Sequence, residues 1–245
     1  MNPETLASLT TLLRQMGEGT LSTLLIFALT LLFSLPLGLL ITFGRRSKYK
    51  IISIPVRFYI LVMRGTPLML QLFFVFYGLN PLFGIQPQRM QAAVIAFVLN
   101  YAAYFAEIYR GGIESIPEGQ YEAGKVLGFT RGQIFRGGIQ SIPRGQYEAG
   151  QVLGMTRSQI FFKVTLLQVI KRVIPPMGNE FITLVKDTSL AQVIAVQELM
   201  HVTEKFASSD VSTVPFFVAA VFYLVMNGVV TRCFTVAEKK FSYYR

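Results

Sequence analysis

Polar residues are grouped between positions 180 and 189, within an otherwise apolar part of the sequence. Glu180 and Asp187 are seven residues apart, about two helical turns, so they share one helix face with Thr183, Thr188 and Ser189 nearby. Ionisable groups in an apolar setting are kept where they face a bundle interior or a watery cavity. Two carboxylates with small hydroxyls suit the binding of a zwitterionic or cationic solute.

A structural interpretation of the same residues stays open. Glu180, Lys186 and Asp187 can form an internal charge network instead of contacting a solute. Asn100, in another apolar run, is a second candidate for solute contact, and a hydrogen bond between helices is its alternative role. Arg64, in the stretch RGTPL, is expected to pair with a carboxylate of the protein in preference to a carboxylate of the solute.

Residues suited to covalent or metal chemistry are too few to form a site. Cys233 and His201 are each the single residue of their type, whereas a zinc site needs several ligands and nucleophilic catalysis needs a base beside the nucleophile. The sequence also lacks the phosphate-binding pattern GxxxxGK[ST]. We therefore predict no catalytic residue, no metal and no cofactor, and any ATP used must bind another chain.

Long apolar runs dominate the 245 residues, which are 52% hydrophobic and only 15% charged, where soluble domains carry about 25% charge. Continuous runs of about 20 apolar residues are typical of transmembrane helices, since barrel strands alternate. We predict an all-α, multi-pass membrane protein whose residues 1–245 form a single transmembrane domain. Its five predicted spans are residues 21–44, 51–79, 92–108, 173–200 and 214–237.

The positive charge is unevenly distributed. The net charge is +10, and Lys and Arg gather in residues 45–50, 110–172 and 232–245, while the two other connections carry only Arg89 and Lys205. Basic loops stay in the cytoplasm, so we predict an N-terminus outside and a C-terminus in the cytoplasm. A nucleic-acid-binding protein would present a basic patch on a soluble fold, and this sequence leaves no such fold.

A tandem repeat occupies the longest basic segment. Residues 110–135 and 136–161 align without a gap, and 21 of the 26 positions are identical. Each copy has a double glycine, a proline, a short helical stretch that ends at glycine, and a threonine suited to begin a second helix. Two copies are too few for a solenoid, so we interpret the repeat as a duplicated functional segment; a solvated surface helix is the alternative.

The second copy and its downstream flank resemble the EAA motif of bacterial ABC import permeases. The motif falls on Glu148, Ala149, Gly150, Gly154, Val164, Leu166 and Leu167, with Gly150 in place of the usual alanine and Leu167 in place of proline. The stretches RGTPL (64–68), YFAEIYRGGI (104–113) and KDTSLAQVI (186–194) resemble the polar amino acid uptake branch of these permeases. The resemblance extends in order over nearly the whole chain.

This resemblance implies a permease subunit of an ATP-driven importer for polar or charged amino acids, with the five-helix type I arrangement. It implies a bacterial inner-membrane location, a second permease chain (a copy or a paralogue), an ABC ATPase dimer and an extracytoplasmic amino-acid-binding protein or domain. A coupling helix would dock on the ATPase. Its residues would be Glu148, Ala149, Gly150 and Gly154 in the second copy, or Glu122, Ala123, Gly124 and Gly128 in the first.

We predict that only one copy docks at a time, and that it is the second. The flank at 161–170 is apolar, helix-forming and completes the motif, whereas Gly137 and Gly138 follow the first copy and each costs a helix about 1 kcal/mol. Residues 110–135 would then lengthen the arm before the docked helix.

Two other classes of membrane protein fit the sequence less well than an importer does. An ion-coupled secondary transporter works without an ATPase, but it is usually longer, with two related halves of membrane helices. A channel needs a filter loop or a ring of charge, and neither is visible in the sequence.

Overall fold

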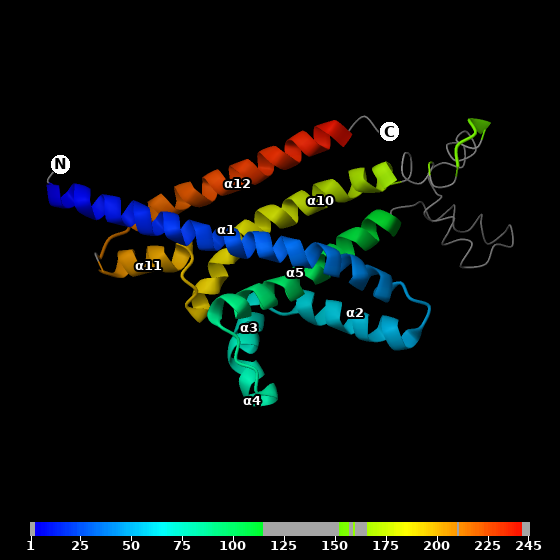
Figure 1. The fold of residues 1–245 in the computed structure, drawn as a ribbon, viewed down its shortest axis with the longest axis horizontal. Coiled ribbons are helices and arrows are strands. Elements are labelled where there is room, and N and C mark those ends of the chain that lie inside the picture. The colour runs from blue at the N-terminus through cyan, green and yellow to red at the C-terminus, as the bar shows by residue number, and fades with distance from the viewer. Residues whose placement is uncertain (1–2, 115–151, 157–158, 160–165, 210, 242–245) are drawn as a thin grey trace. The chain divides into compact units, whose positions relative to one another are not determined.

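The computed structural model describes residues 3–114, 152–156, 159, 166–209 and 211–241. Every regular element in these ranges is helical, as predicted, and Figure 1 labels the α-helices in chain order. The elements are α1 (Pro3–Arg45), α2 (Lys50–Gly65), α3 (Leu68–Phe73), the π-helix η1 (Phe74–Gly78), α4 (Leu79–Phe83), α5 (Arg89–Glu114), α10 (Leu166–Asp187), the 3₁₀-helix η3 (Thr188–Ile194), α11 (Leu199–Ser209) and α12 (Val214–Phe241).

Three of the described helices are long and apolar enough to cross a membrane, namely α1, α5 and α12. The pair formed by residues 50–65 and 68–83 is bent by 110° and counts as a fourth span if it crosses as one. The described residues thus supply three or four candidate spans where the sequence predicts five. The predicted fourth span begins as α10, which carries charged side chains at Glu180, Lys186 and Asp187.

The chain divides into two compact units, which are described separately. The first comprises residues 1–106 and 179–231, and the second comprises residues 107–178 and 232–245.

Small residues allow α1 and α5 to pack closely in the first unit. Gly38 of α1 lies against Ala102 and Phe105 of α5, so that a Cβ at Gly38 would be 2.9 Å from the Phe105 Cβ. The Thr42 hydroxyl donates 2.8 Å to the Gly38 carbonyl and lies 3.1 Å from the Ala106 carbonyl. Small side chains at a membrane helix interface permit this approach, and they place the aromatic residues of α5 inside the unit.

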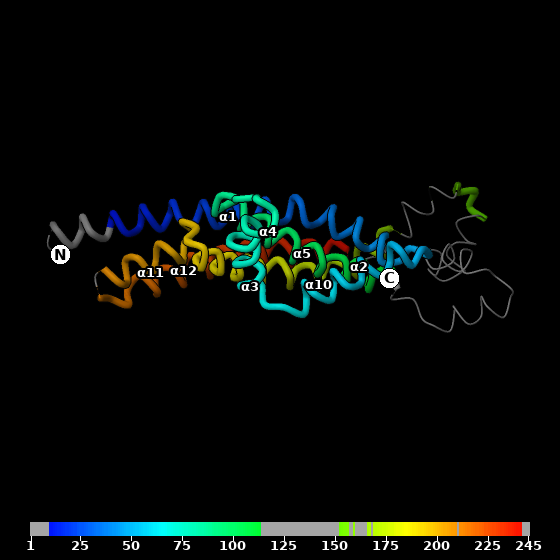
Figure 2. Tube along the Cα trace, turned by 90° about the horizontal axis from the view of Figure 1, so that it is seen from below, coloured from blue at the N-terminus to red at the C-terminus, as the bar shows by residue number. Residues whose placement is uncertain are grey.

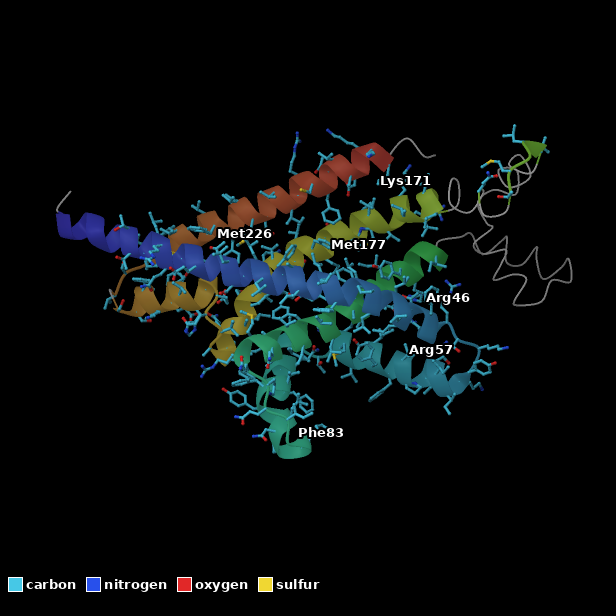
Figure 3. The ribbon with its side chains drawn as sticks, in the orientation of Figure 1. Arg46, Arg57, Phe83, Lys171, Met177 and Met226 are labelled. Atoms are coloured by element: carbon cyan, nitrogen blue, oxygen red, sulfur yellow. The ribbon has the colours of Figure 1, made fainter. Side chains whose placement is uncertain are left out.

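A second contact joins α1, α11 and the first part of α12. Leu12 and Met16 of α1 pack with Leu199 and Val202 of α11, and Met226 of α12 lies against the same cluster (Figure 3). Helices α1 and α11 lie side by side in both ribbon and tube views (Figures 1 and 2). With 43 residues, α1 is about 65 Å long, so it extends well beyond a hydrocarbon core of about 30 Å.

The break between α2 and α3 is held by side-chain amides. Gln71 Nε2 lies 3.0 Å from the Met63 carbonyl and 2.9 Å from Thr66 Oγ1. Asn100 Nδ2 of α5 also donates to the Met63 carbonyl, at 2.9 Å, and to Gln71 Oε1, at 3.0 Å. In lipid, backbone groups released by a broken helix need such partners, so these two amides make the bend at Pro67 possible.

In the second unit, glycines mark the close approaches. A Cβ on Gly112 of α5 would overlap the Val173 side chain of α10, and one on Gly178 would lie 3.0 Å from the Phe234 ring of α12. Helix α10 carries Lys171 and Met177 in Figure 3.

Helix α10 also runs through Pro175 and Pro176. We expected these prolines to break or kink it. A break is wrong, because the turns on either side continue the helix, and prolines inside a helix are accommodated by bending.

Candidate functional site

Asp187 and Tyr101 form the centre of the polar site in the first unit. The Tyr101 hydroxyl donates a 2.7 Å hydrogen bond to Asp187 Oδ2. Tyr101 is only 2% exposed, and its ring contacts Phe97 and Phe105 on the same helix. The carboxylate at the end of α10 is therefore fixed in direction by a packed aromatic residue of α5.

Glu180 and Arg64 extend this site along α10. Glu180 is half-buried and interacts electrostatically with Arg64 of α2 and with Asp187. The Arg64 guanidinium also lies 5.1 Å from the centre of the Tyr104 ring, a distance typical of a cation–π interaction. We call Arg64, Tyr101, Tyr104, Glu180 and Asp187 the acidic cluster, since it holds two carboxylates, one of which interacts with Arg64.

The predicted hydroxyl residues follow the acidic cluster along the chain. The hydroxyl of Thr188 donates 2.7 Å to the Val185 carbonyl, and that of Ser189 donates 2.7 Å to the Lys186 carbonyl. Both bonds lie where α10 gives way to the 3₁₀-helix η3, because hydroxyl side chains compete for helix carbonyls. Thr183 lies half-buried on α10.

Asn100 is held by hydrogen bonds at the α2–α3 break. Its side chain is 5% exposed, and its amide group binds Met63 and Gln71 at the α2–α3 break. These contacts are hydrogen bonds between helices, which is the alternative role that the sequence leaves open for Asn100.

The sequence did not identify three residues of the acidic cluster and of the α2–α3 break, namely Tyr101, Tyr104 and Gln71. Tyr101 and Tyr104 lie among apolar aromatics of one run, where a tyrosine hydroxyl carries no local signal. Gln71 lies in a similar apolar run, but a polar amide four residues after the proline of RGTPL was a usable indication of a stabilised break.

The repeat lies in the second unit, and most of it is outside the described residues. Glu122, Ala123, Gly124, Gly128, Glu148, Ala149 and Gly150 all belong to the part that is not described. Gly154 is described, and its backbone is left-handed with φ of 72°, a conformation that favours glycine at the end of a helix.

A short cap follows Gly154. Gln159 Oε1 accepts from the Thr156 amide at 2.8 Å, and Thr156 Oγ1 accepts from the Gln159 amide at 3.3 Å. This reciprocal pair is a capping box, so Thr156 caps a helix start as predicted. Just before the turn, Val152 and Leu153 are 87% and 78% exposed.

The chain matches the family described as "Binding-protein-dependent transport system inner membrane component" over residues 34–137 and 134–243. The two matched ranges meet at the boundary between the two repeat copies. Each range therefore contains one copy, as expected if a single family domain were interrupted by the duplication.

Similar proteins include several permeases. The chain is 34% identical to the octopine transport system permease protein OccM of Rhizobium radiobacter, covering 84% of this chain and 79% of that protein. It is 32% identical to the L-cystine transport system permease protein TcyB of Bacillus subtilis, covering 94% and 87%. It is 30% identical to the arginine transport system permease protein ArtQ of the same organism, covering 91% and 90%.

A solved structure agrees with these matches. A chain from a crystal structure of an amino acid ABC transporter with histidines superposes with a TM-score of 0.72 at 28% identity, covering 98% of this chain and 99% of that one. A chain of the inward-facing MetNI methionine ABC transporter shares the fold, with a TM-score of 0.62 at 16% identity.

Proposed function

The chain belongs to the binding-protein-dependent transport system inner membrane components, and we propose that it conducts polar or charged amino acids through the acidic cluster. As a member of this family it is the membrane permease subunit of an ATP-driven amino acid importer. ATP hydrolysis takes place on a separate subunit, and a second permease chain completes the membrane part.

The acidic cluster is the observation that carries the proposed cargo class. Glu180 and Asp187 offer two carboxylates to an ammonium or guanidinium group, while Arg64, which interacts with Glu180, partly balances their charge. Hydrogen bonds between charged partners are the stronger ones in proteins. This charge arrangement favours zwitterionic and cationic amino acids, and relatives are named for arginine and octopine transport. Thr183 and Ser189 are proposed to line the same path, and Asn100 to support it from the α2–α3 break.

The partners and the orientation follow from the family and the charge pattern. We assign the N-terminus to the outside and the C-terminus to the cytoplasm, because basic residues gather in 45–50, 110–172 and 232–245. An extracytoplasmic binding protein or domain would deliver the cargo to the outer side. The second permease chain is either a copy of this one or a paralogue.

The second repeat copy is proposed to dock on the ATPase. Its support is the exposed apolar pair Val152 and Leu153, the left-handed Gly154 and the capped start at Thr156. Exposed apolar side chains on a polar loop are suited to a protein partner. Glu148, Ala149 and Gly150 would belong to the same docked helix, and residues 110–135 would form an insertion before it.

Reconstitution tests the importer assignment. The chain is placed in liposomes alone or with its ATPase, its partner permease chain and its binding protein, and uptake of labelled arginine, histidine, glutamine, cystine and leucine is measured with ATP inside. We expect uptake only with the ATPase, strongest for cationic and polar cargo. Equal uptake by the chain alone would instead support an ion-coupled secondary transporter.

Crosslinking identifies the docked copy. A cysteine in the ATPase groove is paired with Glu148→Cys or with Glu122→Cys, after Cys233 is replaced by serine. We expect the bond at position 148. A bond at position 122 alone would assign docking to the first copy, and equal yields would mean that the copies exchange.

A further inference from the structure

A buried carboxylate lies at the start of α11, apart from the acidic cluster. Glu198 is fully buried, and its two oxygens accept from the backbone amides of His201 at 2.6 Å and Met200 at 2.8 Å. Glu198 thereby caps the first turn of α11, whose amides have no partner within the helix. The transport path described above does not use this residue.

A tyrosine connects this cap to three other elements. The Tyr223 hydroxyl of α12 donates to Glu198 Oε2 at 3.3 Å and interacts with the hydroxyls of Thr188 and Thr23. Thr23 Oγ1 of α1 in turn accepts from the Leu199 amide at 3.2 Å. We call Thr23, Thr188, Glu198 and Tyr223 the hub. Its members come from α1, η3, the start of α11 and α12.

The hub and the acidic cluster meet at two consecutive residues. Asp187 is bound by Tyr101 of α5, while Thr188, the next residue, belongs to the hub. A displacement of Asp187 by cargo must therefore be shared with Thr188 through one peptide bond. Since Thr188 is fully buried, the displacement has little room to be absorbed locally.

The backbone between the two sites has the form of a hinge. The α-helix changes at Thr188 to the 3₁₀-helix η3, whose hydrogen-bond geometry is poorer than that of an α-helix. The segment ends at Ala195, whose φ of 55° is left-handed, a conformation that a residue with a Cβ rarely adopts. The far end of this segment leads into Glu198.

We propose that η3 couples cargo binding at Asp187 to the position of α11, with Tyr223 and Glu198 as positioning residues of this coupling. The inference rests on the proposed cargo site. Cargo that binds Asp187 beside Tyr101 displaces the carboxylate, the shift passes through Thr188 to the Tyr223 hydroxyl, and the capped end of α11 follows. Helix α11 moves relative to α1 at Gly19, where a Cβ would be 3.1 Å from the Leu199 backbone.

The test uses Tyr223→Phe and Glu198→Gln in the permease–ATPase complex in liposomes. Both variants keep side-chain size and remove hub interactions. Tyr77→Phe, at an exposed tyrosine, and Glu18→Gln, at an exposed position of α1, are the matched controls. The ATPase rate is measured with and without arginine, and the KM for arginine uptake is measured separately.

In both hub variants we expect the ratio of arginine-stimulated to basal ATPase rate to fall at least about fivefold, which is the lower end of typical allosteric couplings. The KM for arginine uptake should stay nearly unchanged. A wild-type ratio would overturn the proposal. So would a raised KM with a wild-type ratio, because Tyr223 would then act in cargo binding itself.

Two further variants keep the result decisive. If a hub variant fails to assemble, Ala195→Gly relaxes the hinge without touching the hub, and we expect the same loss of stimulation; a wild-type ratio overturns the hinge. Asp187→Asn, measured in parallel, separates the two proposals. Wild-type uptake by Asp187→Asn would refute the cargo site, whereas a normal stimulation ratio in the hub variants refutes only the coupling.

Discussion

The Tyr101 hydroxyl on α5 lies 2.7 Å from Asp187 Oδ2 at the end of α10, across 86 positions of the chain. The bond joins a buried aromatic ring to the carboxylate that the sequence predicts to contact cargo. Asp187 is consequently held in one direction before cargo arrives, and such preorganisation reduces the cost of ordering the site on binding.

Removing that hydroxyl is expected to weaken cargo binding. Tyr101→Phe keeps the ring contacts with Phe97 and Phe105 but loses a hydrogen bond to a charged group, which is worth about 1.5–3 kcal/mol. We predict that the KM for arginine uptake rises about tenfold or more, while assembly with the ATPase is normal. Tyr77→Phe should leave KM unchanged, and an unchanged KM in Tyr101→Phe would mean that Asp187 needs no positioning.

The α1–α5 contact predicts opposite effects for two glycines of the same helix. At Gly38 a Cβ would lie 2.9 Å from the Phe105 Cβ and 3.0 Å from the Ala102 carbonyl, whereas Gly17 has open space. Gly38→Ala should lower the free energy of unfolding by about 1–3 kcal/mol, and Gly17→Ala should raise it by up to about 1 kcal/mol. Thermal melting in detergent measures both, and equal melting temperatures would show that α1 and α5 separate easily.

Asn100 is expected to act on stability more than on cargo affinity. Asn100→Ala leaves the Met63 carbonyl and the Gln71 side chain with fewer partners at the α2–α3 break, at a cost of about 1–3 kcal/mol. We predict a lower melting temperature with an arginine KM close to that of the wild type. Asn80→Ala, at an exposed position of α4, should change neither. A raised KM with normal stability would place Asn100 in the cargo path.

The sequence predicts the helices better than it predicts what they bring together. Apolar runs of about 20 residues identify α1, α5 and α12 directly, since only helices satisfy the backbone of such runs in lipid. The separate helix α11 and the full length of α1 were not predicted, because both depend on contacts outside the apolar core. Leu12 and Met16, for example, are core residues because they pack against Leu199 and Val202 of α11.

The same limit applies to the candidate site. Glu180 and Asp187 stand out because charge in an apolar run is costly, so local sequence was sufficient to find them. Their partners Tyr101 and Arg64 lie on other helices. For Arg64 the sequence predicts a carboxylate partner but not that the partner is Glu180, and Glu198 looks like an ordinary polar residue near a loop. Long-range pairs of this kind become visible only once the helices are placed beside one another.

The repeat interpretation predicts that one copy is dispensable. Deletion of residues 110–135 removes the first copy and connects the second copy directly to α5. Because 21 of the 26 positions are identical in the two copies, the residues that follow α5 stay nearly the same. The second copy also keeps its apolar flank. We expect the shortened chain to assemble with the ATPase and to transport arginine at a rate equal to or above that of the full chain. An inactive deletion variant would show that both copies are needed.

Equilibrium binding of labelled arginine to the isolated permease–ATPase complex, without any binding protein, tests the cargo site most directly. Asp187→Asn and Glu180→Gln each remove one negative charge at nearly constant size, and Glu18→Gln, at an exposed position of α1, is the control. We predict that the affinity falls about tenfold or more in the first two variants, as expected for loss of a charged hydrogen bond, and stays at the wild-type value in the control. Wild-type affinity in both Asp187→Asn and Glu180→Gln would contradict the account and return these carboxylates to a structural role.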